Sequence, residues 1–254
     1  NILMPAARLV AKDDIENIDF IIREIYFLKS KVCSRNGAEW ITDPFVYKIS
    51  NDIFRSKKIK TLGCLYPLGS GLAPLFASEN KTSLMDIKSP WITWPKAYIK
   101  LYGASINQDI LDTDSRPDAI FSGPPWNQRI NDFYDIWSPI KEEDQVELSK
   151  TIKDLDARRI YFSHLNTKKI TISLVPPRIL FQTSKGLIHF RKTIIEKNWL
   201  DAVIQLPNGM IANTNIKGIL LIMNKERSDN DPVYFYDCSE IKKKSKDEKY
   251  TFSM

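Results

Sequence analysis

Two short apolar runs, each stopped by a pair of prolines, constrain the fold of this chain more than any other feature. Asp118-Ala-Ile-Phe-Ser-Gly-Pro-Pro-Trp126 joins an acidic residue and an apolar run to Gly-Pro-Pro-Trp, and Ile170-Thr-Ile-Ser-Leu-Val175 leads into Pro176-Pro177. Runs of this length are typical of buried strands. Proline has no N–H to donate and therefore ends a strand inside a sheet. Each segment predicts a strand whose carboxyl end opens into a stiff loop.

Other strand patterns alternate with helical patterns along the rest of the chain. Further strands are expected from Ile59 towards the glycines at 69–71, and over 82–87, 106–111, 200–206, 216–223 and 233–236. Helices are expected over 13–30, from 43 or 44 to 54, and over 92–102, 142–162 and 185–198. Strands that alternate with helices predict an α/β fold with a mostly parallel, twisted sheet and right-handed crossovers.

The composition excludes several classes of protein. The 254 residues are 43% hydrophobic and 27% charged, as is ordinary for a globular chain. Cysteine occurs only at Cys33, Cys64 and Cys238, and histidine only at His164 and His189, so neither a disulfide framework nor a metal centre is expected. The apolar runs are too short to span a bilayer and the first residues lack a signal-peptide pattern. A cytoplasmic protein with no membrane partner is therefore expected.

A cluster of glycines follows the first predicted strand. Of nine glycines in the chain, Gly63, Gly69 and Gly71 fall close together. A strand, a tight glycine loop and a helix open many nucleotide-type sites, where the backbone approaches a ligand. Asp86 and Asp109 end the next two predicted strands, and ligands of open α/β sheets bind at such ends. Loop glycines that serve only as turns are the alternative interpretation.

Taken in this order, the elements resemble the catalytic domain of N6-adenine DNA methyltransferases, most closely the modification subunit of type I restriction–modification systems. The resemblance spans residues 36–240 and is most specific over 186–225, which includes His189-Phe-Arg-Lys192 and Leu200-Asp-Ala-Val-Ile-Gln-Leu-Pro-Asn-Gly209. It implies a Rossmann-like, S-adenosylmethionine-dependent methyltransferase fold. A helical segment over 1–35 would precede this domain, and a basic, mobile end over 241–254 would follow it.

The resemblance also implies where S-adenosylmethionine binds. The expected cofactor-binding residues are Thr42, Leu65, Tyr66, Gly69, Ser70, Gly71, Asp86, Ile87 and Asp109. The Gly-Ser-Gly loop would hold the cofactor, Asp86 would bind its ribose, Asp109 would approach its adenine ring, and Thr42 would lie near its methionine moiety. Leu65 and Tyr66 stand where the family has an acidic residue and a proline. The candidate counter-charge for the α-ammonium group is therefore missing.

The family's catalytic tetrapeptide falls on Gly123, Pro124, Pro125 and Trp126, where the family has Asn or Asp in the first position. The N6 amine of adenine is a poor nucleophile because its lone pair is delocalised into the ring. Two oxygens that accept its hydrogens would favour a pyramidal nitrogen and relieve developing positive charge. Here Pro124 offers its carbonyl and Trp126 a face for a flipped base, but Gly123 offers no side-chain oxygen. Ser122 and Asn127 are the neighbours that could replace it.

Three hypotheses follow from these patterns. The first is a DNA adenine N6-methyltransferase, as a subunit or fragment of a restriction–modification system. The second is an impaired methyltransferase-like module that binds DNA or a partner subunit without transfer, and the third is an unrelated nucleotide-binding enzyme. DNA is the expected partner, with a separate specificity subunit, because no target-recognition domain is evident. The net charge of +6 permits a polyanionic partner, and the basic segments 57–60 and 242–249 are candidate phosphate contacts.

Overall fold

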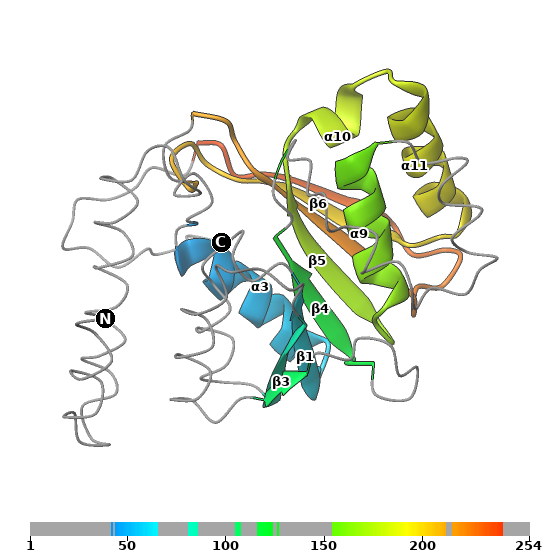
Figure 1. Ribbon diagram of the computed structural model, residues 1–254. Helices are drawn as coiled ribbons and strands as arrows, with labels where there is room; N and C mark the ends of the chain where they lie inside the picture. The colour runs from blue at the N-terminus through cyan, green and yellow to red at the C-terminus, as the bar shows by residue number, and fades with distance from the viewer. Residues whose placement is uncertain are drawn as a thin grey trace.

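The computed structural model describes residues 42, 44–65, 81–85, 105–107, 116–123, 126, 154–211 and 215–240. Eight strands of this part form one sheet (Figure 1). The strands are β1 (Thr61–Leu65), β2 (Lys81–Met85), β3 (Ser105–Asn107), β4 (Ala119–Ser122), β5 (Ile170–Val175), β6 (Leu200–Gln205), β7 (Ile219–Asn224) and β8 (Tyr234–Asp237). The described helices are α3 (Pro44–Ser56), α9 (Leu155–Leu165), α10 (Arg178–Phe181) and α11 (Lys185–Glu196).

The strand order is β3-β2-β1-β4-β5-β7-β6-β8. The first five strands in this order run parallel, as in a doubly wound fold whose order begins 3-2-1-4-5. β7 runs antiparallel to both β5 and β6, and β8 is parallel to β6. The predicted mostly parallel α/β sheet is confirmed. The antiparallel β7 was not predicted; no helix pattern was predicted between β6 and β7 that would carry the chain back across the sheet, and β7 starts at the edge where β6 ends.

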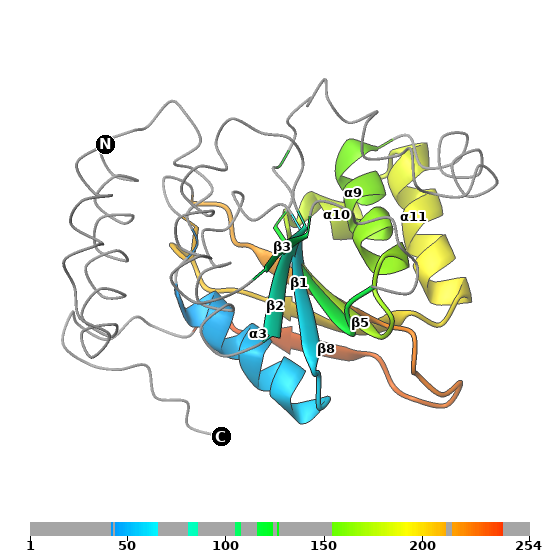
Figure 2. The same ribbon diagram turned by 60° about the horizontal axis from the view of Figure 1, so that its bottom comes forward.

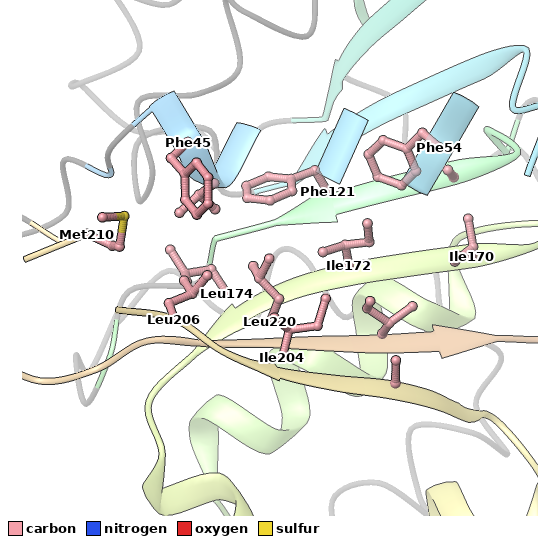
Figure 3. Packing of buried hydrophobic residues seen from close by; sticks show 14 of the residues in the cluster. Phe45, Phe54, Phe121, Ile170, Ile172, Leu174, Ile204, Leu206, Met210 and Leu220 are labelled. Carbon is pink, nitrogen blue, oxygen red and sulfur yellow. The ribbon is translucent and has the colours of Figure 1, made fainter. Parts of the chain in front are cut away.

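Helices cover both faces of the sheet. Figure 2 shows α3 on one face and α9, α10 and α11 on the other. Phe45, Phe54 and Phe121 lie in a row between α3 and the sheet (Figure 3) and belong to one buried cluster. Ile120 belongs to a second cluster on the face of α9 and α11. Successive residues of β4 therefore point to opposite faces, as a strand buried on both sides requires.

The structure corrects several predicted element bounds. The helix predicted over 142–162 is wrong, because Asp154 has an extended backbone (φ −78°, ψ 128°) and caps a shorter helix, α9. Its side chain accepts a hydrogen bond from the N–H of Ala157 at 3.0 Å, and aspartate at an N-cap stabilises a helix start in this way. The strand predicted over 106–111 ends at Asn107, and β7 begins at Ile219 rather than at residue 216.

The remaining predictions divide between the described and the undescribed residues. The strands at β4 and β5 and the helices at α3 and α11 are confirmed close to their predicted bounds. The short helix α10, directly after Pro176-Pro177, was not predicted. The helices predicted over 13–30 and 92–102 lie outside the described residues, as do the segments 1–35 and 241–254.

Candidate functional site

The carboxyl ends of the parallel strands bring the predicted site together at one edge of the sheet. Leu65, the last residue of β1, is paired with Met85 of β2 on one side and with Ser122 of β4 on the other. In the chain, Leu65 leads towards the glycine loop, Met85 is followed by Asp86, and Ser122 is followed by Gly-Pro-Pro-Trp. The strands that lead into the predicted cofactor and base segments are therefore immediate neighbours.

Many of the predicted site residues lie outside the described residues. These are Tyr66, Gly69, Ser70, Gly71, Asp86, Ile87, Asp109, Pro124 and Pro125. Thr42, Gly123 and Trp126 are described, and Leu65 is described through its strand pairing. The geometry of the site is built from these residues and their neighbours.

Trp126 ties the loop after β4 to the neighbouring strand. Its indole N–H donates a hydrogen bond to the backbone carbonyl of Leu174 in β5, with an N···O distance of 3.3 Å. The ring is partly buried and packs against the cluster on the α3 face of the sheet. Part of the side chain therefore belongs to the hydrophobic core. The same contacts hold the ring at the carboxyl edge, beside Gly123.

Ser122 does not supply the missing side-chain oxygen. Its side chain is fully buried, and its Oγ lies 2.8 Å from the Oγ of Ser163 in α9. The Ser163 hydroxyl donates to the carbonyl of Arg159 at 2.8 Å. Because a hydroxyl carries one hydrogen, Ser122 must be the donor to Ser163. The expectation that Ser122 replaces the family's first-position oxygen is therefore wrong, since its hydroxyl is bound on the α9 face of the sheet. Asn127 lies outside the described residues.

Gly123 is buried at the point where β4 ends. Of the described glycines, Gly209 alone has a positive φ, so the backbone at Gly123 does not require glycine. If the alternation of β4 continues, position 123 follows Phe121 to the face covered by α3. A side chain placed at position 123 would then point away from Ser163. The backbone conformation at position 123 therefore allows residues other than glycine.

Thr42 lies at the same edge of the sheet. It is buried and forms an antiparallel bridge with Ile211, in the connection between β6 and β7. Two residues later α3 begins, and Phe45 in its first turn belongs to the same buried cluster as Met210 and Leu174 (Figure 3). The start of α3 therefore faces the region where β4 and β5 end. The proximity of Thr42 to the cofactor's methionine moiety stays a prediction.

A buried set of ion pairs, which sequence reasoning missed, holds α9 and α10 together beside this edge. Arg178, the first residue of α10, pairs with Asp154 at 2.9 Å and also with Asp156. Asp156 in turn pairs with Arg159, 3.4 Å away, and both side chains are fully buried. Burial lowers the pKa of Arg178, but the two carboxylates outweigh burial and the pKa is raised. The Asp-x-Asp-x-x-Arg spacing at a helix start was the signal in the sequence.

The described residues offer neither a metal site nor a membrane-spanning helix. No group of three or more His, Cys, Asp or Glu side chains in this part could hold a metal ion. No helix within it is long and apolar enough to cross a membrane. His164 is buried in α9, with Nδ1 3.1 Å from the hydroxyl of Thr171 and its ring edge-on to Trp199. Burial lowers its pKa, so His164 is a neutral core residue.

Comparison with known proteins shows likenesses in both sequence and fold. The sequence model of the N-6 DNA methylase family matches residues 92–253. The chain is 38% identical over 63 residues to the "Type I restriction enzyme MpnII methylase subunit" of Mycoplasma pneumoniae. The matched stretch covers 25% of this chain and 11% of that protein. The fold is similar to a modification subunit of a putative type I restriction enzyme from Vibrio vulnificus (TM-score 0.57, 13% identity, 95% of this chain and 55% of that chain).

A second solved structure agrees. It is the methyltransferase subunit of a type I restriction–modification system from Streptococcus thermophilus, with a TM-score of 0.56 and 20% identity over 74% of this chain and 44% of that chain. At these identities the two structures bear on the fold, and they confirm the predicted methyltransferase fold. The chain spans about half the length of these solved relatives and matches about a tenth of the curated one.

Proposed function

The chain belongs to the N-6 DNA methylase family, and we propose that it transfers the methyl group of S-adenosylmethionine to the N6 amine of an adenine in DNA. The register of β1 against β4 is the observation that supports this most. It sets the strand that leads to the glycine loop beside the strand that leads to Gly-Pro-Pro-Trp. A cofactor on the first segment and a base on the second would meet at one edge.

Most of the predicted site residues have a task in this reaction. The backbone of Gly69, Ser70 and Gly71 would hold S-adenosylmethionine and Asp86 its ribose, with Thr42, Ile87 and Asp109 lining the rest of its site. The cofactor supplies an electrophilic methyl group. On the substrate side, Pro124 would accept a hydrogen of the N6 amine through its carbonyl. Trp126, anchored on the carbonyl of Leu174, would stack on a base turned out of the helix.

A second candidate function rests on Gly123 and Ser122. Position 123 has no side-chain oxygen, and the neighbouring hydroxyl of Ser122 is bound to Ser163. Loss of one such preorganised acceptor costs about two to three orders of magnitude in rate. The absence of a carboxylate at Leu65 would weaken cofactor binding as well. These residues favour a module that binds DNA or a partner subunit and transfers methyl groups slowly or not at all.

Titration calorimetry with S-adenosylmethionine tests the proposal, with ATP as a matched control ligand. We expect heat and thermal stabilisation from S-adenosylmethionine and none from ATP, because a ligand that binds only the folded state raises its stability. Binding of ATP alone would favour the unrelated nucleotide-binding enzyme. No heat and no shift of Tm at millimolar S-adenosylmethionine would overturn the enzyme hypothesis for this chain.

Partners and setting are part of the same proposal. We place the catalytic domain at residues 36–240, within a restriction–modification system, since the curated relative is named a methylase subunit. A separate specificity subunit would select the DNA target, and the cytoplasm is the proposed location. Measuring whether the chain alone prefers one duplex sequence over another tests whether a separate subunit selects the target. A strong preference by the chain alone would contradict it.

A further inference from the structure

Distant segments of the chain meet at the amino edge of the sheet, opposite the candidate active site. The carboxylate of Asp118 accepts hydrogen bonds from the backbone N–H groups of Lys60 (3.1 Å) and Thr61 (3.2 Å). The backbone carbonyl of Asp118 accepts from the N–H of Lys169 at 2.9 Å, and the carbonyl of Lys169 accepts from the N–H of Lys225 at 2.8 Å. The starts of β1, β4 and β5 and the end of β7 are therefore joined in one row.

These joined segments are strongly basic. Residues 57–60, 116–118, 168–169 and 225 contain a single acidic residue, Asp118, whose carboxylate binds backbone N–H groups. Their basic residues are Lys57, Lys58, Lys60, Arg116, Lys168, Lys169 and Lys225. We call these seven residues the amino-edge cluster. They come from both sides of the sheet, since 57–60 follow α3 and 168–169 follow α9.

Few carboxylates neutralise the amino-edge cluster. Lys57 pairs with Asp201 at 3.5 Å and Lys169 with Glu226 at 3.3 Å, and both lysines are partly exposed. Lys58, Lys60, Arg116 and Lys168 form no ion pair with any carboxylate of the described part of the chain. Lys58, Lys60 and Lys168 are exposed to solvent, and Arg116 is half-buried.

Lys225 is a half-buried member of the amino-edge cluster. Its ammonium group donates to the backbone carbonyls of Leu165 (3.3 Å) and Thr167 (2.5 Å), and to no carboxylate among the residues that the structure describes. Burial and the nearby charge of Arg116 lower its pKa from 10.5 to about 8. A bound anion at this place would relieve the repulsion between these cations.

We infer that the amino-edge cluster binds the phosphate backbone of DNA at a surface separate from the base site. Neighbouring strands lie about 4.8 Å apart, so the row from β1 through β4 and β5 to β7 is about 14 Å long. Phosphates follow one another at about 3.4 Å of helix rise on each strand, so the row matches about four base-pair steps. The contact is independent of sequence because it involves phosphates alone.

The two surfaces lie at opposite edges of the sheet. β5, with six residues, spans about 20 Å between them. A straight duplex seated at the carboxyl edge leaves the amino edge free, so the cluster engages a bent or a second length of DNA. The inference rests on the proposed function only in taking DNA as the polyanion.

Binding of the full chain to a duplex of deoxyguanosine and deoxycytidine tests the inference, because such DNA offers no adenine to the base site. Anisotropy over a range of salt concentrations compares Lys60→Ala/Lys168→Ala with the control Lys185→Ala/Lys192→Ala. Both pairs remove two charges, and the control lysines are exposed on α11. We expect the slope of log K against log salt to fall by about 1.8 in the first variant, about 0.9 for each lost phosphate contact, and to stay unchanged in the control.

The outcomes separate this inference from the proposed function. Equal slopes for both variants would overturn the inference, because net charge alone would then explain binding. Binding of heparin without binding of the duplex would also overturn it, by assigning the surface to another polyanion. If S-adenosylmethionine binds while the amino-edge variants match the control, only the inference fails. If the slope falls as expected while the cofactor does not bind, only the proposed function fails.

Discussion

Replacing Ser163 with alanine should cost more stability than one lost hydrogen bond explains. Ser163 accepts the hydrogen of Ser122 at 2.8 Å and donates its own to the carbonyl of Arg159, also at 2.8 Å. Both serine side chains are fully buried. In Ser163→Ala the hydroxyl of Ser122 keeps its place under the sheet but loses its acceptor.

Ser50 offers a matched control for the magnitude. It is also a fully buried helix residue whose hydroxyl donates to the carbonyl four residues back, Val46, at 2.8 Å. Ser50→Ala therefore removes a similar hydrogen bond and gains a similar helix propensity, but it leaves no neighbouring donor without an acceptor. A hydrogen bond contributes about 0.5–1.5 kcal/mol to stability, and a buried donor left without an acceptor costs about 1–3 kcal/mol. We expect Ser163→Ala to exceed Ser50→Ala by about 1–3 kcal/mol in the free energy of unfolding.

Urea unfolding of the two variants, with Ser122→Ala and the double variant Ser122→Ala/Ser163→Ala, measures the difference. Replacing Ser122 as well removes the donor that has no acceptor. The double variant should therefore lose less free energy of unfolding than the sum of the two single variants, by about 0.5–3 kcal/mol. Changes in midpoint at constant m-value report stability. Equal losses for Ser163→Ala and Ser50→Ala, with additive single losses, would refute the argument that Ser122 is the donor.

Three further predictions concern charged groups. Asp118→Ala should lower the free energy of unfolding by about 1–3 kcal/mol because two backbone N–H groups lose their acceptor. Asp118→Asn keeps an acceptor oxygen and should lose less; equal losses for the two variants in urea unfolding would contradict this. Arg178→Met should lower the free energy of unfolding by about 3 kcal/mol, because Asp154 and the fully buried Asp156 both lose an ion-pair partner; a loss below about 1 kcal/mol in urea unfolding would count against it. The pKa of Lys225 is lowered to about 8 by burial and the charge of Arg116, so its charged form is disfavoured in the folded state. This unfavourable free energy is present in full below pH 8 and disappears as the pH rises towards 10.5. The wild type should therefore gain stability relative to Lys225→Met between about pH 7 and pH 10. A difference in the free energy of unfolding that does not change with pH would contradict this.

The strands at the centre of the sheet could be predicted from the sequence because their signals are local. The prolines after β4 and β5 mark both strand ends to within a residue. The alternation of strands and helices predicted the parallel part of the sheet. The resemblance then assigned the sites to the ends of β1, β2 and β4, and the register brings these ends together.

The rest depended on contacts between residues far apart in the chain. Ser122 looked like a substitute for the missing oxygen because it precedes Gly123, but its partner Ser163 lies 41 residues away. The sequence predicts Asp154 in the interior of a helix over 142–162, whereas its backbone is extended and its side chain caps α9. The amino-edge cluster arises when strand pairing joins the basic segment 57–60 to basic residues that lie far from it in the chain.

Methyl transfer to a single-stranded, adenine-containing oligonucleotide tests the central claim most directly. Single-stranded substrate needs no base flipping out of a duplex, so the chain can be assayed without a specificity subunit. Labelled S-adenosylmethionine is supplied to the wild type, to Gly123→Asn and to the volume control Gly123→Ala, and the DNA is digested to nucleosides. We predict label in N6-methyldeoxyadenosine, at a rate about 10²–10³ times higher for Gly123→Asn than for the other two. Bound cofactor with no label in any of the three, or equal rates for the Asn and Ala variants, would contradict the account.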